Sequence, residues 1–196
     1  SHFGSFWTGL RYSFFQVASI ITTTGYSTCD FNLWPAFSRA ILVILMFIGG
    51  CAGSTAGGLK VARVAILFKG AIRDMKKMLH PNAVSSVRFD RKPLDEKTMH
   101  GVNVYFVTFS LVFTVIFALL CLDCNDLLTN FTALAATINN IGPGLGAVGP
   151  MGSFAVYSPL STLLLSFAML LGRLEIFPIL LLLAPSMWSR RAFRKK

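Results

Sequence analysis

The chain has 196 residues, of which 54% are hydrophobic and only 13% are charged, and its formal net charge is +10. Soluble domains contain roughly 25% charged residues, and here the apolar residues form uninterrupted blocks instead of a periodic pattern. One block, residues 102–122, has no charge and is about as long as the 20 residues that a helix needs to cross a bilayer core. These properties exclude an ordinary soluble domain and indicate a membrane protein.

Most of the positive charge flanks the apolar blocks, which argues against a nucleic-acid partner. The linker at residues 122–130 has two aspartates and no Lys or Arg. Basic flanks mark the cytoplasmic side of a membrane, so we expect the linker outside and the basic loop and C-terminus in the cytoplasm. The basic residues are predicted in one loop, Lys69, Arg73, Lys76, Lys77, Arg88, Arg91, Lys92 and Lys97, and in the tail, Arg190, Arg191, Arg194, Lys195 and Lys196.

The four cysteines do not form a metal-binding pattern. Cys121 and Cys124 make a single C-x-x-C pair with no second pair and no nearby His, so a zinc site is not expected. Two interpretations stay open for this pair: a disulfide in an oxidising periplasm, or two ordinary thiols at a helix end. The chain starts without Met and shows no signal peptide, and we expect it to be a piece of a longer polypeptide.

The first half of the chain predicts a membrane crossing that is broken in the middle. Residues 5–21 predict a short helix, the stretch TTTGYST follows, and the apolar run 36–48 is only about two-thirds of a full span. The segment GGCAGSTAGG, residues 49–58, then has five glycines in ten residues, which disfavours a continuous helix. Non-helical backbone at this depth requires protein or a water-filled cavity around it.

The second half repeats this order. Residues 127–138 predict another half-length helix, NNIGPGLGAVGP follows, and residues 154–188 form an apolar run of about 50 Å if helical, longer than a bilayer core of about 30 Å. We expect this run to bend, with Gly172 and Pro178 as candidate positions. Aligning Gly25 with Gly142 places SIITTTGYS over ATINNIGPG, and internal repeats of this kind flank transport paths.

Each glycine turn follows a half-length helix, and this arrangement suits a cation. The C-terminal end of a helix is negative and has unpaired carbonyl groups, and a ring of backbone carbonyls replaces the water shell of K⁺ in channels with the TVGYG loop. TTGYS, residues 23–27, differs from that loop at two positions. The alternative for TTTGYST is a plain extracellular turn between two helices.

The order TTTGY, GGCAGSTAGGLK, NNIGPG and GRLEIF resembles the Trk/Ktr/HKT superfamily of potassium transporters, most closely the bacterial Trk pore-forming subunits. The resemblance implies an all-α membrane protein with four helix–pore loop–helix repeats and re-entrant half-helices. This sequence would hold the pore helix, filter and broken inner helix of the third repeat at 1–80, a basic cytoplasmic linker at 81–97 and the fourth repeat at 98–196. The implied filter residues are Thr22, Thr23, Thr24, Gly25 and Tyr26, with Asn139, Asn140, Ile141, Gly142 and Pro143.

The resemblance also implies a gate below the filter. The gate residues are Gly49, Gly50, Gly53, Ser54, Thr55, Gly57 and Gly58 in the glycine loop, together with Arg173. Two alternatives apply to the loop: a phosphate-binding loop, which lacks its GK[ST] ending here, and a helix-packing site made of small residues. Ala56 stands where a glycine would also fit, and Tyr26 where phenylalanine is familiar.

Arg173 and Glu175 are the charged residues of the last apolar run. A charge there costs about 2.5–3.5 kcal/mol even on an insertion scale, so we expect Arg173 to face the pore or a partner, and Glu175 to pair with Lys60 or Arg63. The alternative is that both charges only hold helices together.

The sequence therefore predicts K⁺ uptake across the bacterial inner membrane through a carbonyl filter, with no bound cofactor and no metal other than K⁺. The resemblance implies a homodimer in lipid, the missing N-terminal half of the polypeptide and a cytoplasmic nucleotide-binding regulatory ring as partners. A sodium- or proton-coupled secondary transporter with discontinuous helices is the alternative. An enzyme is not expected, because His2, His80 and His100 lie outside the apolar spans.

Overall fold

The computed structural model describes residues 5–51, 53–54, 57–80, 87–89, 92–123 and 125–183. This part of the chain is helical apart from one small antiparallel hairpin, β1 (Arg88–Phe89) and β2 (Lys92–Pro93). Its α-helices are α1 Phe6–Ile21, α2 Ala36–Phe47, α3 Val61–Leu79, α4 Glu96–Leu120, α5 Leu127–Ile138, α6 Pro159–Arg173 and α7 Ile176–Leu183. Short 3₁₀ turns are η1 Phe31–Leu33, η2 Gly146–Val148 and η3 Phe154–Val156.

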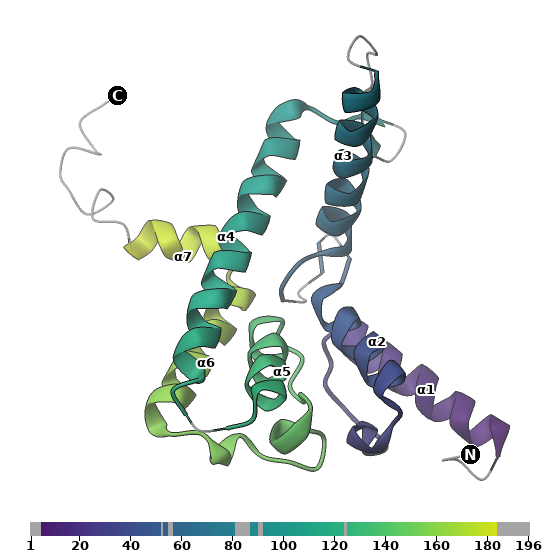
Figure 1. The fold of residues 1–196 in the computed structure, drawn as a ribbon, viewed down its shortest axis with the longest axis vertical. Helices are drawn as coiled ribbons and strands as arrows, with labels where there is room; N and C mark the ends of the chain where they lie inside the picture. Colours follow the sequence, from purple (N-terminus) through teal and green to yellow (C-terminus); the bar gives the residue numbers. More distant parts are fainter. Residues whose placement is uncertain are drawn as a thin grey trace.

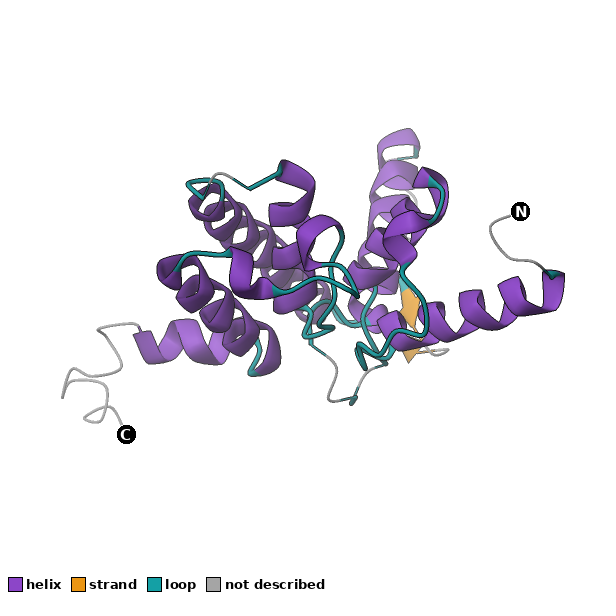
Figure 2. Cartoon of the chain, turned by 90° about the horizontal axis from the view of Figure 1, so that it is seen from below, coloured by secondary structure: helices purple, strands orange, loops and turns teal. Residues whose placement is uncertain are grey.

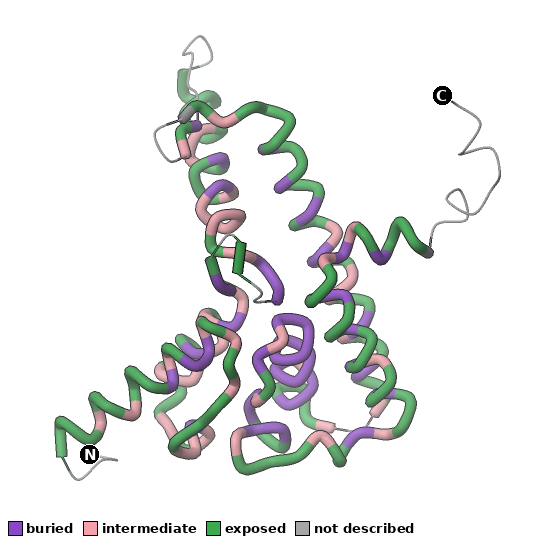
Figure 3. The backbone as a smooth tube through the Cα atoms, turned by 180° about the vertical axis from the view of Figure 1, so that it is seen from behind, coloured by how far each residue is buried: buried purple, intermediate pink, exposed green. Residues whose placement is uncertain are grey.

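Helix α5 is the centre of the fold. It lies between α2 on one side and α4 with α6 on the other, and α1 runs beside α2 (Figure 1). Residues 132–139 are all buried, so α5 is the most enclosed helix in the tube of Figure 3. Its Leu134 and Ile138 belong to a core shared with α4, α6 and α7, whereas Ala135 belongs to a core shared with α1 and α2. Helix α5 has no charged residue, and its Thr132 and Thr137 hydroxyls donate to backbone carbonyls, so it suits such a central place.

An aromatic cluster joins the two halves. The ring of Phe113 on α4 lies 5.6 Å from that of Phe47 on α2 and 5.4 Å from that of Phe131 on α5, both edge to face. Such pairs stabilise by about 0.5–1.5 kcal/mol beyond their buried area. The end of α2 is therefore held against α4 and α5, just before the glycine loop begins.

The helix lengths agree with a membrane protein that has one full span and several partial ones. In the described ranges, α4 is long and apolar enough to cross a bilayer by itself, with a mean hydropathy of 2.2 in its best window. Helices α6 and α7 pass the same test only as a pair, and they meet at 113°. Helices α2 and α5 are apolar but have only 12 residues each.

Two expectations about element bounds were wrong. Lys69, Arg73, Lys76 and Lys77 were expected in a loop but lie on α3, which continues to Leu79. The charges occupy the outer side of an amphipathic helix whose Ile66 and Gly70 are buried, and this pattern is as compatible with a helix as with a loop. Helix α4 starts at Glu96, so the basic linker ends before residue 97.

The bend in the last apolar run also falls elsewhere than at the two expected positions. It lies at Leu174 and Glu175, where Glu175 has a φ of 63°. Gly172 is still helical, and Pro178 is the third residue of α7, a position where its missing N–H costs little. Gly172 serves a close helix contact instead, which is described below.

Candidate ion-conduction site

Helices α1 and α5 each end in a turn with the same pattern of hydrogen bonds. The N–H groups of Thr23 and Thr24 donate to carbonyls in the last turn of α1 at 3.1 and 2.9 Å. Those of Asn140 and Ile141 donate to the equivalent carbonyls of α5 at 3.0 and 2.8 Å. This pair of bonds is the Schellman helix C-cap, and it occurs at the positions that the alignment of Gly25 with Gly142 makes equivalent.

Both turns use the same unusual backbone angles. Thr23 and Asn140 have φ values of 54° and 55°, and Gly25 and Gly142 follow two residues later with φ values of 79° and 116°. Asparagine and glycine accept this left-handed region, but a β-branched threonine there is an outlier. The conformation at Thr23 costs roughly 1–2 kcal/mol, so the surrounding contacts must hold it.

The two glycine turns touch each other. A Cβ atom added to Gly25 would overlap the backbone oxygen of Ile141, and one added to Gly142 would lie 3.9 Å from the Cα of Gly25. The loops of the two halves accordingly meet between the helices in Figure 2. A side chain at position 25 is excluded by contact as well as by φ.

The threonine hydroxyls of the first turn are engaged locally. The hydroxyl of Thr22 donates to the carbonyl of Ala18 at 2.7 Å and lies 2.7 Å from the hydroxyl of Thr24. Tyr26 is exposed and Pro143 is half-buried. None of the filter residues named above carries a formal charge, so this place can offer a cation backbone carbonyls and the negative ends of two helices.

The glycine loop is closed at its base and lies against the end of α5. The N–H of Gly49 donates to the carbonyl of Leu59 at 2.8 Å, which joins the two ends of the loop. A Cβ at Gly57 would lie 2.9 Å from the carbonyl oxygen of Asn139, and one at Gly58 would overlap the Asn139 side chain. The glycines therefore let the loop approach the end of α5 more closely than other residues would allow.

The rest of the predicted loop residues vary in their surroundings. Gly50 is buried and its carbonyl accepts from the N–H of Val61 at 3.2 Å. Gly53 and Ser54 are exposed, and a Cβ at Gly53 would meet nothing within 4 Å. Thr55 lies outside the described residues, as do Cys124 and the basic tail.

The end of α5 also contacts α6. The Asn140 amide donates to the carbonyl of Met169 at 3.2 Å, and a Cβ at Gly172 would overlap the carbonyl oxygen of Ile138. The Asn139 amide donates to Ala135, whereas its buried Oδ1 accepts no hydrogen bond from the described residues. Such an unsatisfied group costs about 1–3 kcal/mol.

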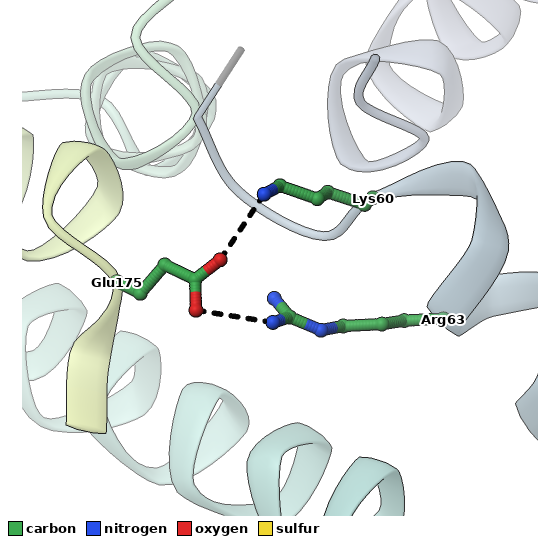
Figure 4. A network of polar contacts seen from close by, with 3 residues as sticks. All are labelled: Lys60, Arg63 and Glu175. Atoms are coloured by element: carbon green, nitrogen blue, oxygen red, sulfur yellow. Dashed lines mark hydrogen bonds and ion pairs between the residues drawn. The ribbon is translucent and has the colours of Figure 1, made fainter. Parts of the chain in front are cut away.

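Glu175 joins the bend between α6 and α7 to the start of α3. Its carboxylate lies 3.1 Å from the amine of Lys60 and 3.1 Å from the guanidinium of Arg63 (Figure 4). Arg63 also lies 4.1 Å from the ring centre of Tyr105 on α4. The predicted partners are thus both present, and they connect the α6–α7 bend to the residues that follow the glycine loop.

Arg173 is exposed and lines a cavity of about 330 Å³. Ser54, Gly58, Gly172 and Glu175 line the same cavity. The structure therefore brings Arg173 to the glycine loop, as the resemblance implies. A second cavity, of about 390 Å³, borders Asn140 and Gly142.

Sequence reasoning missed several buried polar residues of the two pore helices. Gln16 and Ser19 on α1 and Thr129 on α5 are buried, and their side chains bond the backbone that follows each glycine turn. Asn32, in the loop after the first turn, bonds Gly146. Polar residues on the buried side of an apolar helix were the available signal.

Half-length helices that stop at glycine turns, a glycine loop between α2 and α3 and one full apolar span define a helical membrane protein of the pore-loop class. The TrkH family, described as cation transport proteins, matches residues 6–195, and the chain belongs to this family. The predicted family and the predicted all-α membrane fold are confirmed.

Individual relatives agree with this family assignment. The chain is 42% identical over 181 residues to the Trk system potassium uptake protein TrkH of Salmonella typhimurium, covering 92% of the chain and 37% of that protein. It is 39% identical over 178 residues to TrkG of Escherichia coli, covering 90% and 36%. The crystal structure of the potassium transporter TrkH from Vibrio parahaemolyticus matches with a TM-score of 0.87 and 39% identity, over 96% of this chain and 40% of that one. The chain thus spans well under half the length of these relatives.

Proposed function

We propose that this chain forms two of the pore loops of a K⁺ uptake protein of the bacterial inner membrane. The observation that carries the proposal is the pair of matching glycine turns that end α1 and α5 and touch at Gly25 and Gly142. Two such turns supply part of a ring of carbonyl oxygens, and the N-terminal half of the polypeptide supplies the remainder. The relatives named above are K⁺ uptake proteins, which supports K⁺ as the transported ion.

In this proposal the filter works through its backbone. Residues 22–26 and 139–143 present carbonyls that replace the hydration shell of K⁺, favoured by the negative ends of α1 and α5. The second turn lacks the threonines and the aromatic residue of the first, so the pore is only pseudo-symmetric.

The glycine loop and Arg173 form the gate below the filter. The loop lies against Asn139 and lines one cavity with Arg173, so a fixed positive charge stands near the path until the loop moves. Glu175 with Lys60 and Arg63 holds the loop's far end to the α6–α7 bend. Arg173→Ala should raise conductance, and unaltered flux would assign Arg173 to structure.

We further propose a homodimer in lipid, with the basic loop and the C-terminus in the cytoplasm and a nucleotide-binding regulatory ring bound there. The exposed cations of α3, among them Lys76 and Lys77, suit a cytoplasmic partner. A coupled secondary transporter is the second candidate, because α6 and α7 form a discontinuous helix.

The test uses the full-length protein in liposomes, with rubidium uptake measured with and without a membrane potential. Gly25→Ser should lower K⁺ over Na⁺ selectivity, because the new side chain overlaps the neighbouring turn. Gly101→Ser is the matched control, since a Cβ there meets nothing within 4 Å. Unchanged selectivity in Gly25→Ser removes this residue from the filter, and uptake of an organic solute without cation flux refutes the pore.

A further inference from the structure

The backbone after the second glycine turn is hydrogen-bonded to threonine side chains of α5. The hydroxyl of Thr132 accepts from the N–H of Leu145 at 2.9 Å, and that of Thr129 accepts from the N–H of Ala147 at 3.4 Å. Both threonines are at most 3% exposed. A Cβ at Gly146 would overlap the hydroxyl of Thr129, so this segment, residues 145–147, lies directly on the helix.

The same segment, residues 145–147, is also held by Asn32, which lies in the loop after the first glycine turn. The side-chain oxygen of Asn32 accepts from the N–H of Gly146 at 2.9 Å, and its amide nitrogen donates to the Gly146 carbonyl at 3.2 Å. Asn32 is itself fixed, because its N–H donates to the Asp30 carboxylate at 3.0 Å. A Cβ at Gly149 would overlap the Asn32 amide, so the fit at this asparagine is close.

Side-chain bonds of another kind hold the segment after the first turn to its own helix, α1. The hydroxyl of Ser19 donates to the carbonyl of Tyr26 at 2.6 Å, and the amide of Gln16 donates to that of Cys29 at 3.4 Å. The segment that follows each glycine turn is therefore bonded to the helix that precedes that turn, α1 or α5. Asn32 ties the segment of one repeat to that of the other through its two bonds to Gly146.

We propose that Asn32 is a positioning residue for ion selectivity. It does not touch the ion. It fixes Gly146, which follows Gly142 by four residues, and thereby fixes the spacing between the two glycine turns. A carbonyl ring discriminates between K⁺ and Na⁺ only while its oxygens keep their places, and functional groups need support to within about 0.5 Å. This inference rests on the proposed pore function.

The prediction concerns the ratio of K⁺ to Na⁺ flux in the full-length protein in liposomes. Asn32→Ala removes both bonds to Gly146 and should lower this ratio by roughly five- to tenfold, the size expected for one or two ordinary hydrogen bonds. Asn32→Asp keeps the acceptor and loses the donor. Its charge attracts both cations alike, so a lower ratio in this variant reports geometry. Asn103→Ala, at an exposed position on α4, is the matched control and should leave the ratio unchanged.

A second pair of variants tests the support from α5. Thr129→Val keeps the shape and loses the hydroxyl, and should lower the ratio, whereas Thr129→Ser keeps the hydroxyl and should retain it. An unchanged ratio in Asn32→Ala and Asn32→Asp overturns the inference and leaves the pore function standing, and so does a fall in total flux at a constant ratio. Absence of K⁺ flux in the unmodified protein refutes the pore function itself.

Discussion

Glu175 offers the sharpest test of the gate, because its side chain connects the α6–α7 bend to Lys60 and Arg63, which follow the glycine loop. Glu175→Gln keeps the size and one acceptor but removes the charge. The carboxylate is 39% exposed, so each ion pair stabilises by no more than about 0.2–1 kcal/mol. Losing both therefore costs about 0.4–2 kcal/mol, or roughly a 2- to 30-fold change in an equilibrium constant.

If these ion pairs exist only while the loop is shut, Glu175→Gln shifts the gate towards the open state by that factor. The assay is the open probability of the full-length protein in planar bilayers, with Glu96→Gln, an exposed glutamate in the first turn of α4, as the matched control. Glu175→Gln and Lys60→Met should be strongly non-additive, because they remove the same pair. An open probability equal to that of the unmodified protein, or fully additive effects, would refute the assignment.

Three further predictions concern stability in detergent, measured as the midpoint of thermal unfolding. Gly172→Ala should destabilise by about 1–3 kcal/mol, because the added methyl overlaps the backbone of α5, whereas Gly101→Ala, with open space around it, should not. Thr23→Gly should stabilise by about 1 kcal/mol through relief of the left-handed conformation, and an unchanged midpoint would show that the threonine is not strained. Hydrogen bonding from Ser161 and the start of α6 lowers the pKa of Asp123 below its ordinary value of 3.8. The stability that this carboxylate contributes is complete above pH 3.8 and is lost as the pH falls through its lower folded pKa, so Asp123→Asn should lower the midpoint equally at pH 5 and pH 8, and by less in stronger acid.

Much of this architecture could be predicted from the sequence, because apolar block lengths and glycine positions are local properties. Helix α5 has the predicted bounds, and the glycine alignment places Gly25 over Gly142, where the structure has matching turns. The pairing of Glu175 with Lys60 or Arg63 was also predicted, although these residues are 115 and 112 positions away. A carboxylate in an apolar run requires a cation, and the broken crossing of the other repeat supplies two.

The bend after α6 and the left-handed threonine could not be predicted, because tertiary contacts decide both. Gly172 has the flexibility for a bend, but its missing side chain is used where α6 meets α5, and the chain turns three residues later at Glu175 instead. Threonine disfavours a left-handed conformation, so Thr23 gave no local signal for its helix cap.

Asn32 shows the same limit for function. Nothing in its neighbourhood distinguishes it from an ordinary loop asparagine, and its partner Gly146 is 114 residues away. Only the meeting of the two repeats gives the side chain a role. Each glycine turn is positioned by a different set of side chains, Ser19 and Gln16 in one repeat and Thr129 and Thr132 in the other, and Asn32 links the two repeats through Gly146. In the pore proposed above, selectivity should therefore depend on these unequal supports as well as on the glycines that the repeats share.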